Sequence, residues 1–166
     1  MTKNIGITLF VIAILTGRSV LSESKPIVSG AKDMTIAQNN EQALARQVHY
    51  SVNEYRKSLN LAPLTLNAEI SQQARQHSQN MAQNKVEFSH SGFDRRIETL
   101  SISYRSAAEN VGYNQGYRDP VKQAVEGWIE SEGHRQNLTG NYSLTGIGVV
   151  KNRQGEYYFT QIFILD

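Results

Sequence analysis

The chain has 166 residues, of which 39% are hydrophobic and 19% charged, as expected of one soluble domain with some additional sequence. Its formal net charge of +2 is too small to indicate binding to nucleic acid or to an acidic membrane surface. Because the sequence contains no cysteine, disulfides, thiolate metal sites, a cysteine nucleophile and a cysteine-linked lipid are all excluded.

The N-terminus has the pattern of an export signal. Lys3 precedes an apolar run from Ile5 to Leu15, and Arg18 ends that run before it reaches the roughly 20 apolar residues of a membrane span. The pattern predicts a signal peptide over residues 1–21, with an uncleaved N-terminal anchor as the alternative. We therefore expect a secreted or extracytoplasmic protein (periplasm or cell envelope) that meets a membrane only through an uncleaved leader.

The segment after the leader shows no sustained hydrophobic period. Residues 22–38 carry Pro26 and Gly30 and are predicted to form a linker, followed by a domain over residues 39–166. The domain is expected to begin with an amphipathic helix that Pro63 separates from the next element. The apolar positions of this helix recur at helical spacing: Leu44, Val48, Val52, Tyr55 and Leu59.

A second helix is expected after Asn67, whose side chain can cap its first turn. Its buried side comprises Ile70, Ala74, His77 and Met81, and a histidine on such an apolar side is more often a core residue than a ligand. The stretch "KVEFSHSGFDRRIETL" then reads as a loop leading into a short helix, and "AAENVGYN" as a short strand.

The clearest helix lies in "RDPVKQAVEGWIESEG", with Asp119 as its cap and Pro120 at its first position. Its buried positions are Val121, Val125, Trp128 and Ile129, and Gly133 is expected to end it in a left-handed conformation. Finally "LTGIGVV" and "YYFTQIFIL" flank the turn "KNRQGE", as in an antiparallel hairpin. Together these elements predict an α+β domain with helices packed on a small antiparallel sheet.

Four segments occur in an order that points to a family: "FSHSG", "AAENVGYN", "AVEGWIESEGHRQNL" and "YYFTQIFI". In these segments the chain resembles the CAP superfamily of cysteine-rich secretory, antigen-five and pathogenesis-related proteins, and in particular its bacterial branch of secreted SCP-like domains. The resemblance covers residues 43–166. It implies an α-β-α sandwich with a cleft over the sheet.

Eukaryotic members of this family line the cleft with two histidines and two glutamates. By this resemblance His90 matches the first histidine and Glu109 the first glutamate. Ser131 stands at the place of the second glutamate, and Tyr158 at that of the second histidine. His134, just past the expected end of the third helix, offers an imidazole from another direction.

These residues form the expected cleft, and their chemistry leaves two roles open. Two imidazoles and one carboxylate suit Zn²⁺ with an open position for water, which makes His90, His134 and Glu109 candidate metal ligands. Alternatively, His134 and Arg135 bond the last carbonyls of the preceding helix, while Asn137 ties the following loop. No catalytic residue is assigned, because nothing around Ser131 resembles a nucleophile elbow.

Three functions remain open at this stage. The first is a non-enzymatic module that binds an extracellular ligand, such as a lipid, a peptide or a cell-envelope component, in the cleft. The second is a weak, metal-dependent hydrolase of peptide or cell-wall material, in which the His90, Glu109 and His134 group activates water. The third is a structural envelope protein whose polar cluster only braces the fold.

Overall fold

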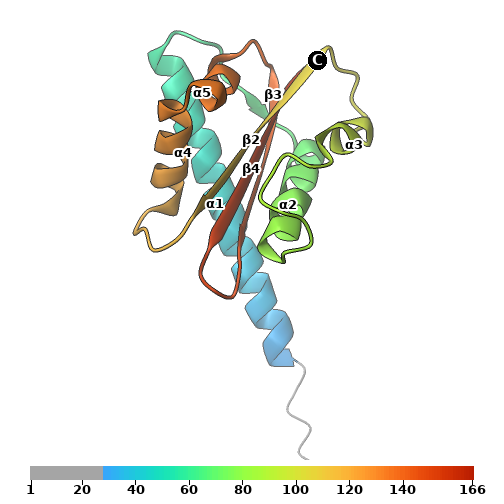
Figure 1. Cartoon of the computed structure of the whole chain (residues 1–166), viewed down its shortest axis with the longest axis vertical. Helices are drawn as coiled ribbons and strands as arrows, with labels where there is room; N and C mark the ends of the chain where they lie inside the picture. Colours follow the sequence, from blue (N-terminus) through green and yellow to red (C-terminus); the bar gives the residue numbers. More distant parts are fainter. Residues whose placement is uncertain (1–27) are drawn as a thin grey trace, which may run out of the picture.

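The computed structural model describes residues 28–166, so the predicted leader and the first part of the predicted linker lie outside the described residues. Five helices and four strands follow one another in this part of the chain (Figure 1). Their bounds are α1 Val28–Ser58, β1 Thr65–Leu66, α2 Ala68–Ala82, α3 Phe93–Glu98, β2 Ser106–Asn114, α4 Pro120–Glu130, α5 Glu132–Thr139, β3 Leu144–Lys151 and β4 Tyr157–Leu165.

The four strands form one sheet in the order β1-β3-β4-β2. Strand β4 pairs antiparallel with both β3 and β2, which confirms the predicted C-terminal hairpin, while the short β1 runs parallel to β3. In this register Asn110 of β2 lies opposite Gln161 of β4, and Gly148 of β3 lies opposite Thr160. Strand β2 is thus an edge strand, which matters for the site described below.

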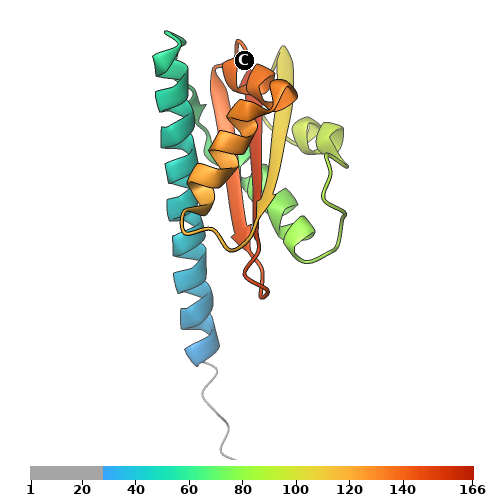
Figure 2. The same ribbon diagram turned by 60° about the vertical axis from the view of Figure 1, so that its left-hand side comes forward.

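Helices cover both faces of the sheet (Figures 1 and 2). Helices α1, α4 and α5 lie on one face, and α2 with α3 on the other, so the predicted α-β-α sandwich is confirmed. The larger core cluster lies between α1, α4 and the sheet, where Val48, Trp128 and Phe159 are almost completely buried. A second cluster joins Ile70 and Ile97 to β4 on the opposite face.

Helix α2 rests directly on β3 because two glycines leave room for it. A Cβ added at Gly146 would lie 2.2 Å from the carbonyl carbon of Ile70, and one at Gly148 would lie 2.2 Å from the backbone nitrogen of Arg75. The predicted apolar side of α2 faces this contact, and Ile70, Ala74, His77 and Met81 are all buried, as expected. The cap that Asn67 forms with the backbone of Glu69 and Ile70 is also confirmed.

The prediction for residues 22–38 needs correction where the structure describes them. Residues 28–38 belong to α1, a helix of 31 residues whose first turns extend beyond the sheet (Figure 2). Residues 32–40 are all exposed, so this part of the helix buries no apolar face and its sequence shows no helical spacing of apolar residues. Once the packed turns around Val48 have nucleated the helix, each residue added toward the N-terminus forms one more backbone hydrogen bond. The Ala, Lys, Met and Gln residues of this segment have high helix propensity and favour the extension. At the other end Leu59, predicted to be buried, lies past the helix and is 45% exposed.

The predicted helix stop at Gly133 is wrong. Helix α4 ends at Glu130, and Ser131, with an extended backbone (φ −83°, ψ 122°), links it to α5. Gly133 lies inside α5 without a positive φ. Arg135 donates from Nη1 to the Ile129 carbonyl at 2.8 Å, which confirms its predicted capping role and makes a left-handed residue unnecessary. The predicted cap of α4 by Asp119 is confirmed as well.

Candidate functional site

A buried carboxylate lies between β2 and α3. The Glu109 side chain is only 2% exposed, and Arg96 of α3 donates from Nη2 to both of its oxygens at 2.8 Å. His90 Nδ1 lies 3.0 Å from Oε1 of the same carboxylate, while 53% of the His90 side chain remains exposed. These three residues, the Glu109 cluster, thus join a loop, a helix and a strand.

The Glu109 cluster does not fit the expected zinc site. Within residues 28–166 no group of three or more His, Asp or Glu side chains is arranged to hold a metal ion. Both Glu109 oxygens already accept hydrogen bonds from Arg96, and the guanidinium charge beside them opposes the approach of a divalent cation. The carboxylate is therefore committed to an arginine rather than available to a metal.

His77 supports this cluster from behind. Its Nε2 lies 2.8 Å from the carbonyl oxygen of Ser89, the residue before His90, and the side chain is buried in α2. Burial lowers the pKa of His77, and the Ser89 carbonyl opposes that shift only in part. This confirms the predicted core histidine, which anchors the loop that carries His90.

Helix α5 is tied to β2 by amide side chains. Asn110 donates from Nδ2 to the His134 carbonyl at 3.1 Å, and Asn137 donates from Nδ2 to Oδ1 of Asn110 at 2.8 Å. Asn137 also reaches the Glu109 carbonyl at 3.3 Å, so it bonds the strand rather than the following loop. Burial, followed by the charge of His90, lowers the pKa of His134. Both effects favour the neutral form of the His134 imidazole.

A recess of about 610 Å³ opens beside the edge strand β2. We call it the β2-edge recess. It is lined by Phe88, Val111, Gly112, Tyr113, Asn114, Gln115, Tyr117, Gln123, Ala124, Gly127, Trp128, Ser131 and His134. Trp128 forms part of its floor, where Nε1 donates to the Val111 carbonyl at 3.0 Å and the ring packs against Gly112.

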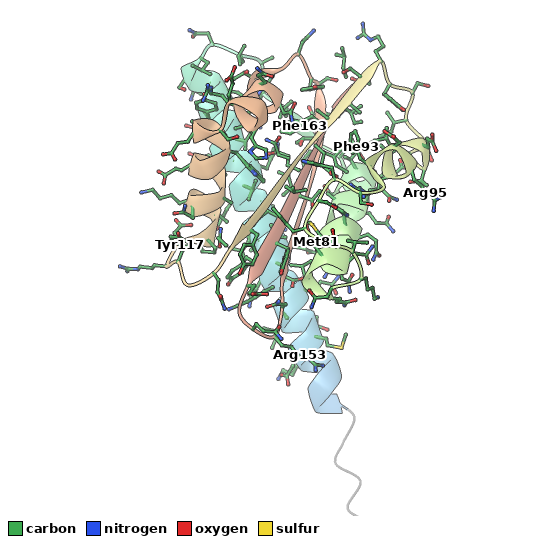
Figure 3. The ribbon with its side chains drawn as sticks, viewed as in Figure 1. Met81, Phe93, Arg95, Tyr117, Arg153 and Phe163 are labelled. Carbon is green, nitrogen blue, oxygen red and sulfur yellow. The ribbon has the colours of Figure 1, made fainter. Side chains whose placement is uncertain are left out.

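Three aromatic side chains stand at this recess with large exposed fractions: 53% for Phe88, 47% for Tyr113 and 53% for Tyr117. The Phe88 and Tyr113 rings meet edge to face at 6.3 Å between centroids. Tyr117 lies in the loop that leads from β2 to the start of α4 (Figure 3). A single exposed ring, such as Tyr50 on α1, is ordinary, whereas apolar rings that gather at one recess mark an interaction surface.

The residues expected to share one cleft line two neighbouring depressions, close enough for the charge of His90 to lower the pKa of His134. Ser131 and His134 line the β2-edge recess, whereas His90 lines a separate depression against α3. The side chain of Glu109 is buried between them. Tyr158 is buried next to Tyr113, and its hydroxyl donates to Glu156 Oε2 at 3.2 Å.

Sequence reasoning missed Arg96 and the aromatic residues of the recess. Arg96 lies in the "FDRR" segment, six residues after His90, and an arginine near a family glutamate is a signal for an ion pair. Tyr113 is in the "AAENVGYN" segment, on the same face of β2 as Glu109. Phe88 and Tyr117 are in loops and give no periodic signal.

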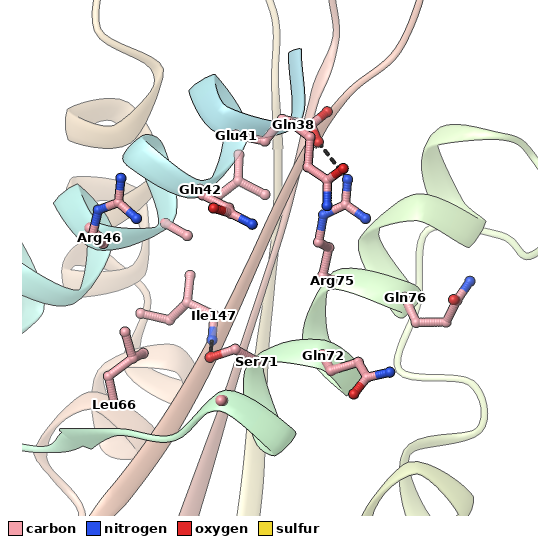
Figure 4. Close-up of a pocket in the computed structure, with 13 residues that line it drawn as sticks. Gln38, Glu41, Gln42, Arg46, Leu66, Ser71, Gln72, Arg75, Gln76 and Ile147 are labelled. Carbon is pink, nitrogen blue, oxygen red and sulfur yellow. Dashed lines mark hydrogen bonds and ion pairs between the residues drawn. The ribbon is translucent and has the colours of Figure 1, made fainter. Parts of the chain in front are cut away.

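A groove of similar volume, about 600 Å³, lies at the opposite edge of the sheet, along β3 and between α1 and α2 (Figure 4). Glu41 accepts from Arg75 Nη2 at 2.9 Å and from the Lys151 backbone nitrogen at 3.0 Å, so it clamps α1 to α2 and β3. None of the predicted site residues lines this groove.

Comparisons with known proteins agree with the fold. The profile of the CAP (cysteine-rich secretory protein) family matches residues 49–163. Protein YkwD of Bacillus subtilis (strain 168) is 34% identical over 78% of this chain and 50% of its own length. An SCP-domain extracellular protein of Bacillus anthracis gives a TM-score of 0.68 at 27% identity, covering 78% of this chain and 43% of that chain. A cysteine-rich secretory protein of Staphylococcus aureus gives 0.62 at 25%, covering 76% and 40%.

This chain spans about half of YkwD and less than half of the two solved structures. Across residues 28–166, the structure contains no helix with the length and apolar character that a membrane crossing requires. The matched region contains His90, Arg96 and Glu109 and all the residues that line the β2-edge recess. The chain belongs to the cysteine-rich secretory protein (CAP) family.

Proposed function

We propose that this chain is a secreted CAP-domain protein that binds a ligand in the β2-edge recess and does not catalyse a reaction. The observation that carries the proposal is the state of Glu109, whose two oxygens are held by Arg96 and His90 while an open recess lies next to it. Export is supported by the signal pattern at the N-terminus and by the extracellular protein of Bacillus anthracis that matches the fold.

The hydrolase alternative has less support. A general base must reach the proton that it removes, and Glu109 is 2% exposed with its oxygens engaged by Arg96. A serine nucleophile needs a base within hydrogen-bond reach, and among the described residues no hydrogen bond joins Ser131 to His134. The remaining exposed group, His90, is oriented by the carboxylate through Nδ1 and keeps Nε2 for a proton, so it is the group of the cluster on which the hydrolase alternative depends.

The structural alternative is also less favoured. A brace alone would bury its polar groups in mutual hydrogen bonds and leave an ordinary surface around them. Here His90 is half exposed, and three aromatic rings stand open beside Ser131 and His134. A recess with an apolar floor and a few polar groups is the usual form of a binding site.

The proposal is tested by mapping ligand contacts on the isotope-labelled full chain by nuclear magnetic resonance. Neutral oligosaccharides, unstructured peptides and phospholipid vesicles are added separately. We expect at least one class to shift the backbone amides of Tyr113, Asn114, Ser131 and His134. The amides of Gln42 and Arg75, in the groove between α1 and α2, serve as the internal control. Shifts confined to that groove, or no shifts with any class, would contradict the proposal.

A further inference from the structure

The lining of the β2-edge recess carries no formal charge. None of its residues is an Asp, Glu, Lys or Arg, and burial lowers the pKa of its single histidine, His134. An anionic ligand such as a phosphate would find no cation among these side chains, and a cationic ligand would find no carboxylate. The recess is therefore suited to a neutral ligand.

The exposed rings offer flat apolar surfaces to such a ligand. Phe88, Tyr113 and Tyr117 come from three different segments, and each exposes about half of its surface. An aromatic ring has an electron-rich face and loses little conformational freedom on binding. The C–H groups on one side of a pyranose ring carry a partial positive charge, so a sugar ring stacks well on these faces.

Two polar atoms at the recess are buried without a hydrogen-bond partner among the described residues: Asn114 Oδ1 and His134 Nδ1. Asn114 is 6% exposed, and its Nδ2 is fixed by the Pro120 carbonyl at 2.8 Å. Gln161 Oε1 in the core lacks a partner in the same way, so these two atoms show unused hydrogen-bonding capacity beside the recess rather than a contact with its contents. Sugar hydroxyls both donate and accept, and hence suit the amides of Gln115 and Gln123 and the Ser131 hydroxyl, which also line the recess.

An extended peptide suits the same place less well. A peptide that adds a strand to a sheet edge needs a run of free backbone groups. On β2 the Glu109 carbonyl already accepts from Asn137, and the Val111 carbonyl accepts from Trp128. Side chains thus cover the edge at two successive outward-facing positions.

We propose that the β2-edge recess binds a neutral oligosaccharide, with sugar rings stacked on Phe88, Tyr113 and Tyr117 and hydroxyls bonded to the polar side chains of the lining. This inference rests on the proposed function, because it names the ligand class of the same recess. Trp128 is the only tryptophan in the sequence and lines the recess, so its fluorescence is a specific reporter.

The test is a fluorescence titration of the full chain with soluble chitin and cellulose oligosaccharides. We expect a saturable change in the emission of Trp128, with an affinity that added NaCl leaves unchanged because no charges pair. Tyr113→Ala, Phe88→Ala and Tyr117→Ala should each weaken binding about three- to tenfold through the loss of one stacking ring. Tyr113→Phe, which keeps the ring, should restore most of the affinity.

Tyr50→Ala is the matched control, because Tyr50 is 66% exposed on α1 and does not line the recess. Unfolding midpoints of all the variants verify that the fold is intact. No saturable signal with neutral oligosaccharides, or equal weakening by Tyr50→Ala, would overturn the inference. If peptides or vesicles shift the recess amides and oligosaccharides do not, this inference fails while the proposed function stands. If no class shifts them, both fail.

Discussion

At the scale of single residues, Glu109 connects more of the molecule than any other polar side chain of the site. Its carboxylate accepts from Arg96 of α3 and contacts His90 of the preceding loop, while its backbone carbonyl accepts from Asn137 of α5. A buried carboxylate is tolerated only with such partners. The same bonds that make Glu109 structurally important leave it without a free oxygen for proton transfer.

Glu109→Gln should destabilise the fold by about 3 kcal/mol. The substitution leaves the Arg96 guanidinium, which is only 12% exposed, without its counter-charge. The measurement is the free energy of unfolding from chemical denaturation. Glu126→Gln is the control: the Lys122–Glu126 pair is 3.8 Å apart and well exposed, so its loss should change stability by less than about 0.5 kcal/mol. Equal effects of the two substitutions would show that Glu109 is not a buried brace.

At the scale of elements, the contact of α2 with β3 and the junction of α4 with α5 show what glycine does in this fold. Gly146 and Gly148 permit direct backbone contact between helix and strand. Gly133, by contrast, has no heavy atom within 4 Å of the position that its Cβ would take. The two kinds of glycine should therefore respond oppositely to the same substitution.

Gly148→Ala should destabilise the protein by about 3 kcal/mol, because its Cβ would collide with the backbone of Arg75, which cannot move independently of α2. Gly133→Ala should stabilise it by about 0.5 kcal/mol, since alanine favours the helix and nothing opposes the added methyl group. Thermal unfolding of both variants gives the comparison. A loss of stability for Gly133→Ala would contradict the helical position of this residue.

The sequence predicted the elements well and the site only partly, for physical reasons. Regular apolar spacing and capping residues, such as Asn67 and Asp119, report local structure, and the structure agrees with them. The helical state of residues 28–38 depends on propagation from packed turns further along, which apolar spacing does not record. The pairing of Glu109 with Arg96 arises only when α3 packs beside β2, and the exposure of Tyr113 only because β2 is an edge strand.

At the scale of the whole molecule, the β2-edge recess spans the edge of the sandwich, with Tyr113 on the same face of β2 as Glu109 and Trp128 on the other. Figure 1 shows α4 and α5 on one side of the sheet and α2 with α3 on the other. The Glu109 cluster lies on the α3 side, and most of the β2-edge recess lies toward α4 and α5. The central claim of this account is that the protein binds at this edge without catalysis.

That claim is tested most directly by looking for cleavage products. Peptides and cell-wall glycan fragments are incubated with an equimolar amount of the wild-type full chain and analysed by mass spectrometry. A parallel incubation contains the His90→Ala variant instead. Because the His90 side chain is 53% exposed, its removal should leave the fold intact while eliminating the only accessible acid–base group of the Glu109 cluster. We expect the same absence of specific products in both samples. Cleavage by the wild-type chain that His90→Ala abolishes would show that the protein is an enzyme.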